Sequence, residues 1–118
     1  MKTLDRIFGW LMLLGAFGHA TGSWQYYSNR DHMALLWALS GSFAVILLGT
    51  MNLLRAGRRG DRALAWVCFG GCVVWIGFVV VFGRLIGNLV DFRVLTNFVI
   101  TAVLAAFSLR SAFALPRQ

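Results

Sequence analysis

The chain has 118 residues, of which 59% are hydrophobic and only 13% are charged. A soluble domain is nearer half apolar and a quarter charged, so this composition excludes an ordinary water-soluble protein and places much of the surface in lipid. The net charge of +7 does not indicate a nucleic-acid partner, because the basic residues lie between apolar runs and form neither a basic tail nor a recognition motif.

Four apolar stretches are each long enough to cross a bilayer, which takes about 20 residues of helix. They cover residues 5–23, 33–54, 62–86 and 93–114. The connectors are short, and no long polar segment remains for a domain outside the membrane. The expected fold is all-α, an antiparallel bundle of four transmembrane helices in which residues 1–118 form a single domain.

The first expected span carries a seam of glycines at Gly15, Gly18 and Gly22. Their spacing places them on one face of a helix, and small residues allow membrane helices to approach closely. We therefore expect this face to pack against another helix. His19 lies beside the seam, near the outer end of the span.

The tripeptide Gly18-His19-Ala20 also has the small-x-small form of a signal-peptide cleavage site, and it follows a basic start and an apolar run. Against cleavage, Asp5 would lie inside the leader and Gly22 of the same seam would lie beyond the cut. We therefore interpret this segment as an uncleaved span.

The second span has one stripe of mostly small and polar residues, which predicts its inward-facing side. The stripe comprises Ala38, Gly41, Ser42, Val45, Gly49 and Asn52. Asn52 is expected to hydrogen-bond to a neighbouring helix, because a polar side chain at membrane depth needs a partner.

The third span contains Gly70 and Gly77, seven residues apart, and ends in a Gly83-x-x-x-Gly87 ridge. We predict that these glycines are also packing positions. The ridge suits pairing with a second copy or with another protein, although GxxxG is a common pattern in membrane helices.

Two cysteines, Cys68 and Cys72, lie four residues apart on one face of the third span. An intrahelical disulfide at this spacing would need unusual geometry, and zinc would need more ligands than the neighbourhood offers. Both are expected to be small buried hydrophobic side chains, so no metal site is predicted.

The fourth span also has a face of small and polar residues, which predicts an inward orientation for that face. The face consists of Asn97, Thr101, Ala105, Ser108 and Ala112.

Basic residues are divided unevenly between the two sides of the expected bundle. The side that holds both termini carries most of them, so the positive-inside rule places both termini in the cytoplasm. Small size and the use of arginine over lysine favour the inner membrane of a bacterium. The inner set is Lys2, Arg6, Arg55, Arg58, Arg59, Arg62, Arg110 and Arg117, and the outer set is Arg30, Arg84 and Arg93.

The acidic residues follow a regular pattern, because each lies just before or at the start of one span. Aspartate is a preferred N-cap, and its charge favours the positive end of the helix dipole. No carboxylate remains in the middle of a span, which argues against a proton antiporter driven by a buried carboxylate. The predicted N-caps are Asp5, Asp31, Asp61 and Asp91.

A further set of polar residues falls at the outer end of the bundle and is a candidate for a water-accessible vestibule. The interpretation we favour is that these residues lie at the membrane–water interface, since helix ends and loops must be polar. No catalytic residue is predicted. The candidate cluster is His19, His32, Arg84, Asp91 and Asn97.

A b-type haem would need axial histidines that face each other across the bundle. His19 and His32 are the two histidines of the chain, and His32 falls close to a loop. No further motif supports a cofactor, so none is predicted.

These observations favour a non-enzymatic accessory or interaction protein, whose partners are the lipid bilayer and either a second copy or a larger membrane protein. The alternative is an oligomeric transporter or channel for a small solute or ion, which would use the outer vestibule. A haem- or quinone-linked redox subunit is the weaker alternative.

Overall fold

The computed structural model describes residues 2–58 and 60–114, and this part of the chain folds into four helices and no strand. Each expected span corresponds to one helix, so the all-helical prediction is confirmed. Two of the expected inner cations, Arg59 and Arg117, lie outside the described residues. The helices are α1 (Lys2–Tyr27), α2 (His32–Gly57), α3 (Arg62–Leu85) and α4 (Phe92–Phe113).

Of the helices in the described ranges, three are long and apolar enough to cross a bilayer, namely α2, α3 and α4. Large apolar side chains are exposed on all four helices, including Phe17, Trp37, Phe78 and Val99. An exposed apolar surface of this extent is stable in lipid and not in water. The chain therefore has the surface of a membrane protein.

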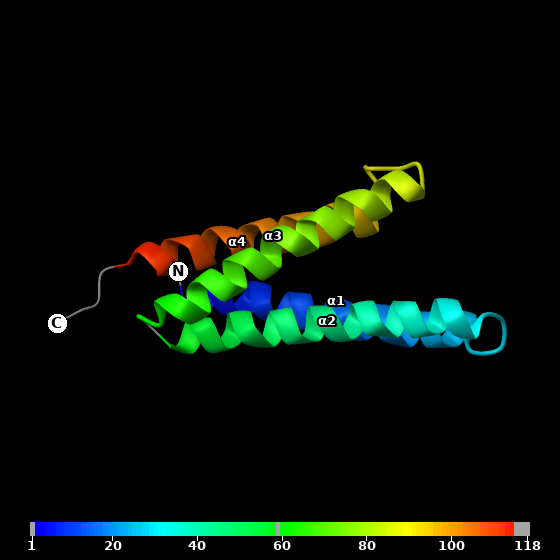
Figure 1. Ribbon diagram of the computed structural model, residues 1–118, viewed down its shortest axis with the longest axis horizontal. Helices are drawn as coiled ribbons and strands as arrows, with labels where there is room; N and C mark the ends of the chain where they lie inside the picture. Colours follow the sequence, from blue (N-terminus) through cyan, green and yellow to red (C-terminus); the bar gives the residue numbers. More distant parts are fainter. Residues whose placement is uncertain (1, 59, 115–118) are drawn as a thin grey trace.

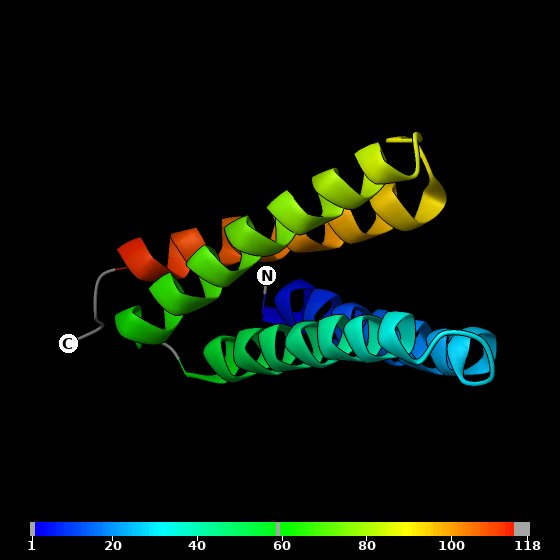
Figure 2. The same cartoon turned by 45° about the vertical axis from the view of Figure 1, so that its right-hand side comes forward.

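The helices form two antiparallel hairpins, α1–α2 and α3–α4 (Figure 1). Within each hairpin the two helices pack together along their lengths, whereas the hairpins meet mainly through α1 with α4 and α2 with α3. The hairpins lie close together where α1 begins and α4 ends, and they diverge toward the α1–α2 and α3–α4 turns (Figures 1 and 2). The result is an elongated body of 57 × 24 × 21 Å.

Three of the four aspartates are N-caps. The side chains of Asp31, Asp61 and Asp91 accept hydrogen bonds from backbone N–H groups at the starts of α2, α3 and α4. The prediction for Asp5 is wrong, because this residue lies within the first turn of α1 and its carboxylate binds Arg55 instead. A guanidinium offers two charge-assisted hydrogen bonds, which are stronger than one bond from a backbone N–H.

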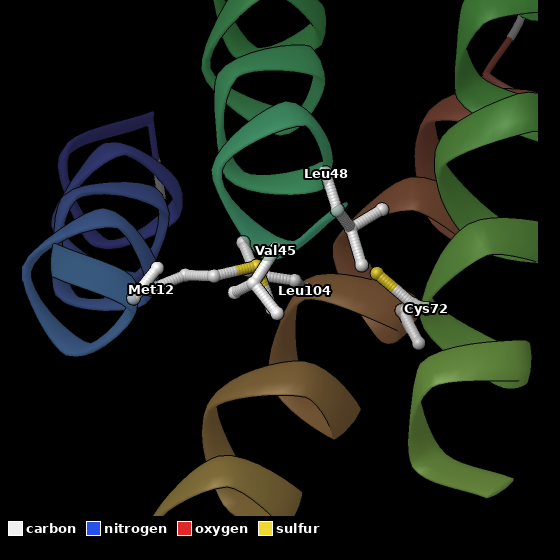
Figure 3. Close-up of a cluster of buried hydrophobic side chains, with 7 residues drawn as sticks. Met12, Val45, Leu48, Cys72 and Leu104 are labelled. Atoms are coloured by element: carbon white, nitrogen blue, oxygen red, sulfur yellow. The ribbon is translucent and has the colours of Figure 1, made fainter. Parts of the chain in front are cut away.

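An apolar layer joins the hairpins near the middle of the molecule. Figure 3 shows Met12 of α1 directed toward Val45 and Leu104, and Leu48 of α2 facing Cys72 of α3. All five side chains are buried, and together they bring all four helices into one core.

The glycines pack differently from the prediction. Gly49 and Gly83 do approach other residues closely, since a Cβ on Gly49 would lie 3.0 Å from Leu13 and a Cβ on Gly83 would lie 2.9 Å from Leu89. A Cβ on any of the other predicted packing glycines would meet nothing within 4 Å, so these glycines make no close contact inside the bundle, and their packing against another chain stays a prediction. They are Gly15, Gly18, Gly22, Gly41, Gly70, Gly77 and Gly87, of which Gly87 has a positive φ of 69° in the α3–α4 turn.

The packed face of α1 is instead the stripe of Gly9, Ala16 and Ser23, which are buried and seven residues apart. A Cβ on Gly9 would lie 2.7 Å from Leu53 of α2. A seven-residue repeat keeps a seam facing its partner along a gently supercoiled pair of helices. The α1–α2 contact therefore leaves the other glycine seam of α1 open.

Candidate functional site

Polar side chains from all four helices meet inside the bundle at the end where α1 begins and α4 ends. We call this set the inner network. Its centre is Arg55, which is 2% exposed. A charged group this deeply buried is costly unless it is fully paired. The members are Asp5, Asn52, Arg55, Cys72, Ser108 and Ser111.

Arg55 forms a bidentate ion pair with Asp5. Its Nη1 donates to Asp5 Oδ2 at 3.1 Å, and its Nη2 donates to Oδ1 of the same carboxylate at 2.5 Å. Nη1 also reaches α4, where it donates to Ser111 Oγ at 3.0 Å and to the Phe107 carbonyl at 3.4 Å. Arg55 thus ties the first hairpin to the last turns of the second.

Asn52 makes a second connection between the hairpins one turn before Arg55. Its Oδ1 accepts a hydrogen bond from Ser108 Oγ at 3.0 Å, and its Nδ2 donates to the Leu48 carbonyl at 3.0 Å and to Cys72 Sγ at 3.6 Å. The prediction that Asn52 bridges neighbouring helices is confirmed. Both the oxygen and the nitrogen of the Asn52 side-chain amide therefore have hydrogen-bond partners.

The cysteines behave as small buried side chains. Cys68 and Cys72 are fully buried and form no disulfide, which confirms the prediction for both. The described residues contain no group of three or more His, Cys, Asp or Glu side chains that is close enough to bind a bare metal ion.

The sequence alone does not predict the inner network, because Arg55 also fits the pattern of a cytoplasmic surface charge. A usable signal was present, since the buried stripe of α2 continues from Asn52 to Arg55 and Ala56. Asp5 of α1 lies one turn before the buried Gly9, and its side chain is 12% exposed. Two opposite charges at the same end of two inward stripes predict an ion pair.

The predicted outer cluster is dispersed over the two hairpins. Asn97 donates to the Arg93 carbonyl in its own helix at 2.9 Å, and Asp91 accepts from Arg93 Nε at 2.9 Å. Hydrogen bonds from the side chain and the backbone N–H of Arg93 hold the pKa of the Asp91 carboxyl below its usual value, so Asp91 is ionised at neutral pH. His32 and Arg84 are exposed, at the start of α2 and the end of α3.

His19 is the member of that cluster with a defined partner in another helix. Its Nδ1 lies 2.8 Å from Ser42 Oγ of α2. Ser42 Oγ also lies 3.0 Å from the carbonyl of Ala38 in its own helix, so the hydroxyl links His19 to the backbone of α2.

An apolar groove of about 320 Å³ lies between α2 and α3 where the hairpins begin to separate. Its walls include Ala44, Gly70, Val74 and Phe78. The neighbouring Trp75 Nε1 is covered by other atoms and has no hydrogen-bond partner among the described residues. A buried N–H group without a partner costs free energy, so this part of the interface between the hairpins is imperfectly packed.

No family model, no curated protein and no solved structure matches this chain.

Proposed function

We propose that this protein is a non-enzymatic accessory protein of a bacterial inner membrane, which acts by associating with another transmembrane helix. The observation that carries the proposal is the open glycine seam of α1. Gly15, Gly18 and Gly22 are exposed, and side chains at these positions would meet nothing within 4 Å. In lipid, small residues on an outer face favour close packing against a helix from another chain.

The composition of α1 supports the same proposal. This helix is not among the three that are apolar enough to span on their own, yet it pairs with α2 along its length. A less apolar span is better accommodated when a further helix covers its open face. The partner is a second copy of this chain or a larger membrane protein.

Transport through a single chain is less well supported. The inner network and the outer polar residues are separated by the apolar layer that contains Met12, Val45 and Leu104. An ion crossing that layer would lose its hydration without gaining ligands.

The proposed topology has α1 as a fourth span and both termini in the cytoplasm. Single cysteines introduced at Asn29 and Asn88 are expected to react with a membrane-impermeant maleimide from outside the cell. Cysteines at Thr3 and Ala114 are expected to react only after the membrane is disrupted. The native chain is a suitable background because Cys68 and Cys72 are buried. Labelling of Thr3→Cys from outside would contradict this topology.

Association through α1 is testable by cross-linking in the native membrane. Leu11 lies four residues before Gly15 on the same face of α1 and is exposed. A photoreactive residue at this position is expected to give a discrete adduct larger than the chain. The same residue at Val99 on α4 is the control and is expected to give none. The double variant Gly15→Leu/Gly18→Leu should abolish the Leu11 adduct, because the added side chains occupy the approach of the partner.

The matched control for that variant is Gly70→Leu/Gly77→Leu on α3, whose added side chains also meet nothing within 4 Å. This control should keep the adduct. Unchanged cross-linking in the α1 variant, or equal adducts from Leu11 and Val99, would refute association through α1.

A further inference from the structure

The apolar groove between α2 and α3 is left open by small residues on both helices. Gly71 allows α3 to approach α2 closely, since a Cβ at this position would lie 2.8 Å from Leu48. Beside this contact Ala44 and Gly70 are exposed, and a Cβ on Gly70 would meet nothing within 4 Å. The groove continues along α3 to Phe78. Its volume of about 320 Å³ is at the lower end of the range for pockets that hold small molecules.

The size and lining of the groove define the kind of molecule that fits it. Every residue that lines it is apolar or aromatic, so a charged solute would lose its hydration there without gaining ligands. One turn of a helix of about 10 Å diameter occupies about 420 Å³, which is more than the whole groove. A hydrocarbon chain is thin enough and apolar enough to lie in it.

Unpaired positive charge lies at one end of the line along which α2 and α3 face each other. Arg58 and Arg62 flank the α2–α3 turn, both are exposed, and neither forms an ion pair with another described residue. Arg59 adds a third cation to the same turn in the sequence. The carboxylate of Asp61 is used to cap α3, where it accepts a hydrogen bond from the Leu64 N–H. The turn therefore carries more positive charge than the protein itself neutralises.

The distance between these cations and the groove matches the length of a phospholipid. From Arg62, α3 rises about 12 Å to Gly70 and about 24 Å to Phe78. One leaflet of a bilayer is about 20 Å thick, and its headgroup region accounts for the first 5–7 Å or so. When the cations lie at the level of the phosphates, the groove therefore lies at the level of the acyl chains.

We propose that the groove and the basic turn are two parts of one site for an anionic phospholipid. The phosphate lies between Arg58 and Arg62, and one acyl chain lies in the groove. Basic residues beside a membrane helix attract anionic lipids, and basic pockets between membrane helices bind their headgroups. A lipid without net charge fits the groove but does not balance the charge of the turn. The site does not depend on the proposed association through α1.

The headgroup part of the site is tested by native mass spectrometry of the purified full-length protein in a neutral detergent. Phosphatidylglycerol and phosphatidylcholine with the same acyl chains are titrated, and the wild type is expected to bind phosphatidylglycerol more tightly. Arg58→Gln/Arg62→Gln should weaken that binding by about tenfold or more, since each cation near an anionic lipid contributes about 1 kcal/mol. The matched control is Arg30→Gln/Arg84→Gln, which removes two exposed cations at the opposite end of the helices and should bind as the wild type does.

The acyl-chain part is tested by filling the groove. Gly70→Leu should weaken the binding of phosphatidylglycerol, because its side chain occupies the groove. Gly77→Leu is the matched control on the same helix. Its added side chain also meets nothing within 4 Å, but Gly77 does not line the groove, so binding should be unchanged. Glycerol 3-phosphate has a similar charged group and no acyl chain, and it should not displace the lipid.

Four results would overturn the proposal. They are equal binding of the two lipids by the wild type, an unchanged affinity in Arg58→Gln/Arg62→Gln, an unchanged affinity in Gly70→Leu, and displacement of the lipid by glycerol 3-phosphate. A thermal unfolding curve for each variant without added lipid excludes misfolding as the cause of lost binding. The cross-linking result from Leu11 is unaffected by any of these outcomes, so the two proposals fail separately.

Discussion

Replacing Asp5 by alanine is expected to destabilise the protein by about 3–5 kcal/mol, which is the cost of leaving a buried charge without its partner. Arg55 is 2% exposed and gives two hydrogen bonds to this carboxylate. Ser111 and Asn52 remain as acceptors in the variant, but they are neutral and do not balance the charge. The measurement is the free energy of unfolding in micelles, by steric trapping or denaturant titration.

Two controls identify the cause of this loss. The double variant Asp5→Leu/Arg55→Leu should recover most of the stability, because apolar residues often replace a buried ion pair at little cost. Asp91→Ala removes the carboxylate of the exposed pair with Arg93 and the N-cap of α4, so it should cost no more than a cap and an exposed pair contribute, which is well below the loss in Asp5→Ala. A loss in Asp5→Ala no greater than in Asp91→Ala would mean that water reaches Arg55.

The second large effect is expected for Leu104→Ala, which removes a side chain that is fully buried where the hairpins meet. We expect a loss of about 2–3 kcal/mol. This is the lower part of the range for such substitutions in soluble cores, because lipid is as apolar as leucine and only the packing and cavity contributions remain. The unfolding free energy is again the measurement.

The matched control is Leu95→Ala on the same helix, where the side chain is 47% exposed. It removes the same atoms from a position that faces lipid, so its effect should be below that of Leu104→Ala by at least about 1 kcal/mol. Equal losses at the two positions would contradict the location of the core between the hairpins.

The helices and their order could be predicted from hydropathy and caps, because burial in lipid is a property of each segment by itself. Asp31, Asp61 and Asp91 mark the starts of three helices in the sequence as clearly as in the structure. Thr101 and Ser108, on the predicted inner face of α4, are also buried.

Which face of α1 packs inside could not be predicted in the same way. Gly9, Ala16 and Ser23 form one small-residue seam and Gly15, Gly18 and Gly22 form another, and the spacing is acceptable for both. The choice depends on the shape of α2, where Leu53 and Gly49 receive the residues opposite them. Complementarity between two surfaces is not a property of either helix alone.

The inner network could not be predicted from the sequence for a related reason. Asp5 matched the pattern of an N-cap and Arg55 matched the pattern of a cytoplasmic charge, so each had a sufficient explanation by itself. The stripe of α2 that includes Asn52 could be extended to Arg55 in the sequence, but the face of α1 that carries Asp5 is known only once the hairpin is formed.

The division of the bundle into two hairpins predicts an order in which the helices insert and pack. Asp5 and Arg55 belong to the same hairpin, so the guanidinium can be neutralised while α3 and α4 are still being synthesised. The bonds from Asn52 to Ser108 and from Arg55 to Ser111 must wait for the last helix. We therefore expect the first hairpin to insert as a charge-balanced pair of helices. The second hairpin then docks onto it and adds no buried charge to the inner network.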